Sequence, residues 1–484
     1  MSIGRKIFYN TLAQSLGKIF AVIIGLVTLG FLSRYLGEQG FGQYSTIIAV
    51  LGLFATLADM GLYLYTVREI SKPDTNHKKV ISNALGLRLV SAMTILVVGS
   101  LITLVFPYDP LVKKTIFVGI AAFLFISLNQ VLVGIFQKHL VQYLIVAAET
   151  VGRLVNLALV YFFIRQALGL PHFIAALILA NATIFFLTLF FAKRLEKFSI
   201  EFDLQYWKEI LRVSWPLIFA VILNLVYFKT DTVILSLFYD AKTVGIYSLP
   251  YKLLEGLLAF PAMFVGLIMP LLSASAFKNW VKFKQILQYS FDAVYLMAIP
   301  IIVTVLFFTT EIIDLLRGSE EYLDSPALLQ ILIFAAATIF FGTLFGYSVV
   351  AVNQQKAMIK GYLLGAIIGL FLYFILIPPF AYWGAAIGTI ITEIVVAAYA
   401  YFLVRKTSGQ KISWKIAWLS LPGAIVMVGF FYFIEIFWIL EILVGILLYA
   451  SISILTKAVP FEFVRNILFV EKTHQSIHPP SHES

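Results

Sequence analysis

The sequence contains no cysteine, and charged side chains occupy only 12% of its 484 positions. Without cysteine there can be no disulfide, thiolate nucleophile or cysteine-ligated metal. A soluble domain averages roughly 25% charged residues, so a soluble fold of this length would have too few polar side chains to cover its surface. With 61% hydrophobic residues, the chain is instead expected to lie in a membrane.

Signatures of nucleotide hydrolysis and covalent catalysis are also missing. No GxxxxGK[ST] phosphate loop occurs, so ATP hydrolysis by this chain is not expected. The six histidines offer no credible Ser/His/Asp set, and no connection between apolar runs is long enough to hold a catalytic domain. We therefore expect a protein that is not an enzyme and that needs neither cofactor nor metal.

Long apolar runs dominate what is present. A helix of roughly 20 apolar residues crosses a bilayer. About fourteen segments reach or approach this length, at 12–34, 43–65, 84–106, 115–136, 143–163, 172–192, 213–237, 248–272, 288–310, 327–352, 361–377, 384–404, 416–436 and 441–458. The sequence thus predicts an all-α, multi-pass membrane protein.

The basic residues predict how the chain is oriented. Of the 35 Lys and Arg residues, 24 lie in connections on the side that holds both termini, 6 lie on the opposite side, and 5 lie within the spans. Because positive loops stay in the cytoplasm, both termini are predicted to lie there. The chain itself is predicted to span the cell membrane. The same bias explains the net charge of +10 without nucleic acid as a partner.

Two stretches of the chain are near-copies of each other. Phe20–Val27 reads FAVIIGLV and Phe219–Val226 reads FAVILNLV, and each is followed by Leu-Ser and then by Gly-x-Tyr-Ser, which begins at Gly42 and at Gly245. The repeated unit is about six spans. An even number of spans re-enters the membrane in the same direction, so two six-helix bundles related by a pseudo-twofold axis along the membrane normal are predicted. A shared apolar composition is the alternative explanation.

The repeat divides the chain into five parts. We expect an N-terminal six-helix bundle at 1–192, a cytoplasmic interfacial linker helix at 193–212 and a C-terminal six-helix bundle at 213–405. Two additional transmembrane helices follow at 406–458, and a polar cytoplasmic tail ends the chain at 459–484.

Several short motifs carry a family resemblance over about residues 1–405, and they are specific only as a set. They are Asn10, Arg34-Tyr35-Leu36-Gly37, Phe41-Gly42-Gln43-Tyr44, Asp59-Met60-Gly61-Leu62, Trp215-Pro216, Asp231, Val244-Gly245-Ile246-Tyr247, Tyr251-Lys252, Pro261, Pro270, Ile377-Pro378, Gly384-Ala385-Ala386-Ile387-Gly388-Thr389 and Glu393. The chain resembles the polysaccharide-transporter branch of the multidrug/oligosaccharidyl-lipid/polysaccharide exporter (MOP) superfamily.

The resemblance implies two bundles around a V-shaped hydrophilic cavity. It also implies that polyprenyl-diphosphate-linked oligosaccharide is flipped from the inner to the outer leaflet by alternating access. Membrane lipids, a proton or sodium ion as coupling ion, and a polysaccharide polymerase and glycosyltransferases would be its partners. The two extra helices resemble those of the lipid II flippase branch, in which they form a groove for the lipid tail. A lipid II-type flippase and a cation-coupled multidrug exporter are therefore alternatives.

Charged residues inside the spans are candidates for the transport path. Each costs at least about 2.5–3.5 kcal/mol at the centre of a bilayer, so such residues usually face a cavity or a partner. A diphosphate needs cations, and the candidates for the substrate path are Arg153, Lys229, Lys252 and Arg88. The candidate gating or coupling acids are Asp59, Glu149, Asp231, Glu255 and Glu393.

Spacing suggests two local arrangements among these residues. Glu149 and Arg153 are four residues apart, which favours an intrahelical pair, and such a pair would also serve a purely structural role. Asp59 and Arg88 lie toward the inner ends of their spans, where either could instead reach the interface by snorkelling. Glu393 has no partner nearby in the sequence and could hold a proton or a cation, or accept hydrogen bonds from neighbouring helices.

The seventh and eighth spans carry the densest charge. Lys252 and Glu255 are three residues apart and share a helix face, and Lys229 and Asp231 lie at similar depth in the neighbouring span. Cross-pairs between these spans are predicted, either as a gate or as permanent contacts between helices. Proline removes a backbone donor, and we expect the eighth span to bend between Pro261 and Pro270.

Overall fold

The computed structural model describes residues 3–72, 75–139, 141–317 and 321–459. Within these ranges the regular structure is entirely helical. The helices are α1 (Ile3–Leu57), α2 (Leu62–Ile70), α3 (His77–Ile102), η1 (Thr103–Val105), α4 (Pro110–His139), α5 (Tyr143–Arg165), α6 (Leu170–Leu195), α7 (Leu204–Phe238), α8 (Ala241–Leu257), α9 (Ala259–Ser275), α10 (Trp280–Phe307), α11 (Thr309–Asp314), α12 (Ser325–Ala351), α13 (Gln355–Ser408), α14 (Lys415–Phe433) and α15 (Trp438–Leu455). The predicted all-α membrane fold is confirmed.

Two of the helices are each interrupted by a single non-helical residue. Gly37 breaks α1 with φ 65° and ψ −179°, and Ala381 breaks α13 with φ 48° and ψ −128°. Glycine adopts a positive φ without steric cost, whereas alanine does not. Eleven helices in the described ranges are long and apolar enough to cross a membrane, and both interrupted helices are among them. The two breaks fall between predicted spans, and the count of fourteen stays a prediction.

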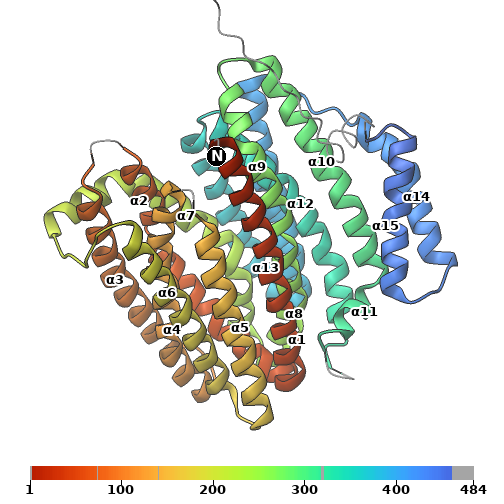
Figure 1. Cartoon of the computed structure of the whole chain (residues 1–484). Coiled ribbons are helices and arrows are strands. Elements are labelled where there is room, and N and C mark those ends of the chain that lie inside the picture. The colour runs from red at the N-terminus through yellow and green to blue at the C-terminus, as the bar shows by residue number, and fades with distance from the viewer. Residues whose placement is uncertain (1–2, 73–74, 140, 318–320, 460–484) are drawn as a thin grey trace, which may run out of the picture.

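The helices gather into two groups (Figure 1), and close backbone contacts between the two halves of the chain occur at Gly42 and Gly245. On one side α3, α4, α5 and α6 pack on one another, and on the other side α12 packs on α13 and α9, while α7 packs on α13. Helix α1 contacts both groups, through α5 and through α8. We call the end of the molecule that holds Gly37 and α11 the Gly37 end.

The two Gly-x-Tyr-Ser copies meet where α1 crosses α8. A Cβ atom on Gly42 would lie 1.6 Å from the Ala241 carbonyl oxygen, and one on Gly245 would lie 2.0 Å from the Glu38 carbonyl oxygen. Ala241 precedes Gly245 by four residues, as Glu38 precedes Gly42, so the contact is the same in both directions. Only glycine allows backbones to approach this closely. The repeat thus marks a symmetric contact between the two halves.

Hydrogen bonds also join the two halves of the chain at the Gly37 end. Ser33 Oγ donates to the Leu316 carbonyl at 2.5 Å, and Tyr322 Oη donates to the Ser33 carbonyl at 3.2 Å. Glu38 accepts from the Tyr322 backbone N–H and forms an ion pair with Lys242 at 3.0 Å. These bonds hold the first half to α8 and to the connection before α12.

The segment predicted as a linker helix at 193–212 is not a separate helix. Helix α6 ends at Leu195, an extended segment follows, and α7 begins at Leu204. The Glu201 backbone N–H donates to the Ser82 carbonyl, and the Asp203 N–H donates to the Asn83 side chain. Because these amides bond to α3, they cannot form a helix among themselves.

The Asp203 carboxylate starts α7. It accepts hydrogen bonds from the backbone N–H groups of Gln205 and Tyr206 at 3.1 and 3.0 Å, which caps the helix. The second half of the predicted linker is therefore the first part of α7, a helix that continues without interruption to Phe238.

The chain between α8 and α9 breaks earlier than predicted. The interruption lies at Leu258, and α9 then runs through both Pro261 and Pro270. Pro261 has no N–H to donate to the carbonyl of Leu257, which is where α8 ends. The interruption thus precedes the first proline, and a bend between Pro261 and Pro270 stays a prediction.

Helices α14 and α15 pack on each other and against α10. Gln288 of α10 exchanges two hydrogen bonds with the backbone of Ser413, at 2.9 and 2.8 Å, which fixes the connection into α14. In Figure 1 the two helices lie at the edge of the second group, far from α2–α6. Residues 460–484 of the predicted tail lie outside the described residues.

Candidate functional site

Two of the predicted cations and one predicted acid meet in a single cluster. Lys229 of α7 and Lys252 of α8 both form ion pairs with Glu255, each with a different carboxylate oxygen. The Lys252 Nζ–Oε2 distance is 2.7 Å. About one third of each lysine side chain and about one quarter of the Glu255 side chain stay exposed. We call these three residues the lysine cluster.

The lysine cluster lines a cavity of about 220 Å³ between the two halves. Ser45 and Thr56 of α1 and Thr232 and Ser248 of the second half contribute hydroxyl groups to its wall. Hydroxyl and ammonium groups are the donors that bind phosphate oxygens. The arrangement therefore presents a net positive charge and neutral donors from both halves to one small space.

Asp231 does not join the lysine cluster. Its side chain is 1% exposed, and it accepts hydrogen bonds from Tyr247 Oη at 2.6 Å, from the Thr232 N–H at 2.6 Å and from Thr389 Oγ1 at 3.4 Å. Thr389 in turn lies 3.2 Å from Tyr373 Oη. The predicted cross-pair between spans is thus formed by Lys229 and Glu255, while Asp231 ties α7 to α8 and α13.

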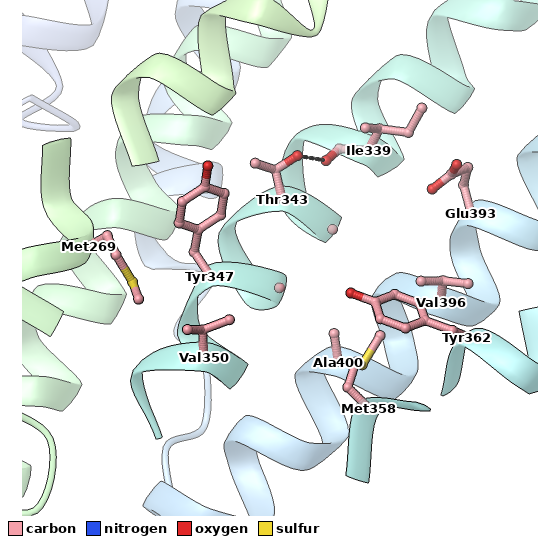
Figure 2. Close-up of a pocket in the computed structure, with 12 residues that line it drawn as sticks. Met269, Ile339, Thr343, Tyr347, Val350, Met358, Tyr362, Glu393, Val396 and Ala400 are labelled. Carbon is pink, nitrogen blue, oxygen red and sulfur yellow. Dashed lines mark hydrogen bonds between the residues drawn. The ribbon is translucent and has the colours of Figure 1, made fainter. Parts of the chain in front are cut away.

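Glu393 of α13 lies in a different cavity, inside the second half (Figure 2). This cavity has a volume of about 440 Å³, and its wall includes Met269, Thr343, Tyr347 and Tyr362. The Glu393 side chain is 5% exposed and forms no ion pair with any of the described residues. A carboxyl group in this setting can hold a proton or attract a cation.

Arg88 and Asp59 form a buried ion pair rather than lying at the interface. The Nη1–Oδ1 distance is 2.7 Å, and Arg88 is fully buried. The guanidinium group also donates to the carbonyls of Ala58 and Ser127 and to the Gln130 side chain. Snorkelling is therefore wrong for Arg88, because carbonyl acceptors inside the protein take the place of water. Arg88 does not line the cavity of the lysine cluster.

Glu149 and Arg153 do not form the predicted intrahelical pair. No ion pair joins them, although both side chains are described. Arg153 instead points toward α1, where its Nη1 donates to the Ala21 carbonyl at 3.3 Å and lies 3.1 Å from the position of a Cβ on Gly25. The Arg153 side chain is exposed, so its place in a substrate path stays a prediction.

An apolar cavity of about 680 Å³ lies where α15 faces α9 and α10. Phe260 and Pro261 of α9, Pro300 of α10 and Tyr449 of α15 are among its lining residues. This surface matches the apolar character of a lipid chain.

The sequence did not point to several members of these sites. Tyr373 joins the Asp231 network through Thr389 and lies more than 140 positions further along the chain; Thr389 belongs to one of the family motifs, but nothing in the sequence indicated that it contacts Asp231. Tyr247 carried a signal because it belongs to the repeated Gly-x-Tyr-Ser motif. Ser45 and Ser248 of the lysine cluster's cavity belong to the same repeated motif, whereas Thr56 and Thr232 carried no signal.

Comparison with protein families decides the assignment. The family model described as "Polysaccharide biosynthesis protein" matches residues 3–276, which is more than half of the chain. The chain belongs to this family. A second model, MatE, matches residues 216–375. Together they confirm the predicted MOP superfamily membership as a polysaccharide transporter.

Members of this family among curated proteins are similar at low identity. A putative O-antigen transporter from Shigella flexneri is 24% identical over 345 residues, which cover 68% of this chain and 81% of that protein. A probable low-salt glycan biosynthesis flippase from Haloferax volcanii, Agl15, is 24% identical over 249 residues, covering 49% of this chain and 52% of that one. These relatives are transporters and flippases, not enzymes.

Solved structures show the same fold. The lipid II flippase MurJ in an inward closed conformation gives a TM-score of 0.74 at 14% identity and covers 94% of this chain and 99% of its own. An inward-facing multidrug resistance MATE transporter gives 0.65 at 13% identity, covering 80% and 94%. The chain is thus a multi-pass membrane protein with the fold of the superfamily.

Proposed function

We propose that this protein flips polyprenyl-diphosphate-linked oligosaccharide from the inner to the outer leaflet of the cell membrane by alternating access. Its membership of the polysaccharide biosynthesis family and its similarity to an O-antigen transporter and to a glycan flippase support this substrate class. Both termini would lie in the cytoplasm, and the Gly37 end would face outward.

The lysine cluster is the observation that carries the proposal. A diphosphate has oxygens that accept several charge-assisted hydrogen bonds, each roughly twice as strong as a neutral one. Lys229 and Lys252 supply two ammonium groups on the wall of a cavity to which both halves contribute. A head group bound there would contact both halves, so its passage would be coupled to their relative movement.

The lipid tail of the substrate would bind to an apolar surface. The polyprenyl tail would lie in the apolar cavity between α15, α9 and α10, in contact with membrane lipids. Each buried methylene group contributes about 0.8 kcal/mol, so even a short stretch of tail adds appreciable affinity. A polysaccharide polymerase and glycosyltransferases would consume and supply the substrate on the two sides.

Glu393 and Asp231 would provide the coupling to a proton or sodium gradient. Glu393 forms no ion pair with the described residues of its cavity, while Asp231 lies in a hydrogen-bonded network on the adjacent helix. Asp59 is a weaker candidate, because Arg88 already neutralises it. Glu149 also stays a weaker candidate.

The proposal is tested by reconstitution. Purified protein in proteoliposomes should flip a fluorescent oligosaccharide carried on a long polyprenyl diphosphate, and should not flip the same sugar on a short, water-soluble chain. Replacing both lysines (Lys229→Gln with Lys252→Gln) should lower the rate at least about tenfold, since each lost charged hydrogen bond is worth about 1.5–3 kcal/mol. Lys114→Gln is the control, because Lys114 lies outside the cavity.

A lipid II-type flippase is the second function that a specific observation favours. Helices α14 and α15 are present, and the structure covers 99% of the MurJ chain. The same proteoliposomes, loaded with a peptide-bearing disaccharide lipid, separate the two substrates. Faster flipping of the peptide-bearing lipid would replace the lead proposal, and transport of an organic cation in place of either would favour the multidrug exporter.

A further inference from the structure

The lysine cluster contains an anionic side chain, the Glu255 carboxylate. Each oxygen of the Glu255 carboxylate contacts a different lysine, one on α7 and one on α8. Lys252 is three residues before Glu255 on the same helix, whereas Lys229 approaches from the neighbouring helix. The carboxylate therefore bridges two cations as a bidentate ligand would.

This bridging position is the one that a phosphate group would take. A phosphate presents two oxygens with nearly the same spacing as those of a carboxylate, and both groups accept from the same ammonium donors. Each ammonium has three N–H donors, but a phosphate that reached both lysines would place its negative charge beside the Glu255 carboxylate. Glu255 and a diphosphate head group therefore compete for the positive charge of the same two lysines.

The cluster is also positioned for such an exchange. All three side chains line the cavity and stay partly exposed to it, so an anion entering the cavity reaches them without unfolding a helix. By contrast, in the Arg88–Asp59 pair the cation is fully buried, and backbone carbonyls surround the guanidinium group. Ser45 and Thr56 on the facing helix offer hydroxyls to the incoming anion.

We propose that Glu255 is a resident counter-anion that the diphosphate of the substrate displaces from Lys229 and Lys252, and that reclaims both lysines when the substrate leaves. The inference rests on the proposed function, because it concerns the same cavity. It assigns Glu255 a positioning role: its carboxylate keeps the two cations paired in the empty state and limits how tightly the substrate is held.

The test measures binding and turnover in the full-length purified protein, with inorganic pyrophosphate as the probe for binding. Glu255→Gln removes the competing charge and keeps the shape of the side chain. We expect pyrophosphate to bind about tenfold more tightly, since roughly one charged interaction no longer has to be broken. Flipping of the lipid-linked oligosaccharide should slow by a similar factor, because release becomes rate-limiting.

A matched control separates the local effect from net charge. Glu435→Gln raises the net charge by the same amount, but Glu435 lies in the connection between α14 and α15. It should leave pyrophosphate affinity unchanged. Glu255→Asp gives a second measurement should the glutamine variant fold poorly: its shorter side chain cannot bridge both lysines, so an intermediate gain in affinity is expected.

The outcomes distinguish this inference from the proposed function. If Glu255→Gln or Glu255→Asp, with an unchanged melting temperature, binds pyrophosphate no more tightly than the original protein, the counter-anion role is wrong. If that happens while the double lysine variant still loses transport, only the role of Glu255 falls. If the double lysine variant transports normally, the cationic cavity itself is not the path.

Discussion

Arg88 shows how a charged residue in a membrane helix can be structural. Asp59 neutralises the guanidinium group, and the carbonyls of Ala58 and Ser127 and the amide of Gln130 take its remaining hydrogens. The contacts join α3 to α4 and to the end of α1. Removing one partner of such a pair leaves a charge without compensation in a medium that cannot solvate it.

Asp59→Ala should therefore destabilise the protein by about 3 kcal/mol, the lower part of the range for breaking a buried ion pair. Thermal unfolding in detergent measures the effect as a lower melting temperature. Glu69→Gln serves as the control, since its pair with Lys72 is at the surface and contributes less than about 1 kcal/mol. Equal melting temperatures for the two variants would contradict a structural role for Arg88.

Glu393 represents the opposite case, a buried acid that forms no ion pair within the described part of the chain. Glu393→Gln keeps the shape of the side chain but can neither take up a proton nor neutralise a cation. We expect flipping down a substrate gradient to continue, while its acceleration by an imposed proton or sodium gradient disappears. Proteoliposomes with and without each gradient provide the measurement.

The control for Glu393 is Glu441→Gln, which alters another buried carboxylate, on α15. This variant should keep the acceleration. A Glu393→Gln protein that still responds fully to the gradient would remove Glu393 from the coupling step.

Among the elements, the crossing of α1 and α8 depends on two glycines. A methyl group at Gly42 would overlap the Ala241 carbonyl, so the two helices would have to separate. Gly42→Ala should therefore weaken closure at the Gly37 end and shift the protein toward a state open on that side. The chain has no cysteine, so a single reporter such as Ser45→Cys can be labelled without background.

A membrane-impermeant thiol reagent added on the outer side measures this shift. Labelling of Ser45→Cys should be several-fold faster when Gly42→Ala is present. Gly266→Ala is the matched control, because a Cβ there would meet nothing within 4 Å. The same labelling rate for both glycine variants would show that the crossing does not control access to the cavity.

How well the sequence predicted each element depended on whether local interactions determine it. Apolar length placed the membrane helices. The loss of a backbone donor at Pro261 is a local effect, and the helix is interrupted just before it, at Leu258. The linker at 196–203 could not be predicted as extended, because its amides bond to Ser82 and Asn83, more than 100 residues earlier. The break at Ala381 falls between two predicted spans and follows Pro378 and Pro379, but its exact position had no signal, since alanine favours a continuous helix.

For the whole molecule, the candidate site was predictable as a set of charges but not as a set of partners. The three-residue spacing indicated the Lys252–Glu255 pair, and similar depth indicated Lys229. The network around Asp231 is assembled from α7, α8 and α13, and nothing in their spacing fixes how these helices pack. Tertiary packing decides which acid contacts which base, and this packing cannot be read from a single sequence.

The Gly42–Gly245 contact has the form of an isologous dimer interface, in which each partner presents the same patch to the other. In a dimer of two identical six-span proteins, each copy would place its glycine against the backbone of the other. One sequence motif would therefore supply both sides of the contact. Fusing the copies into one chain would then free each to change alone. Lys229 and Glu255 have no such constraint from the first half, so a single chain can carry one charged wall where a homodimer would carry two.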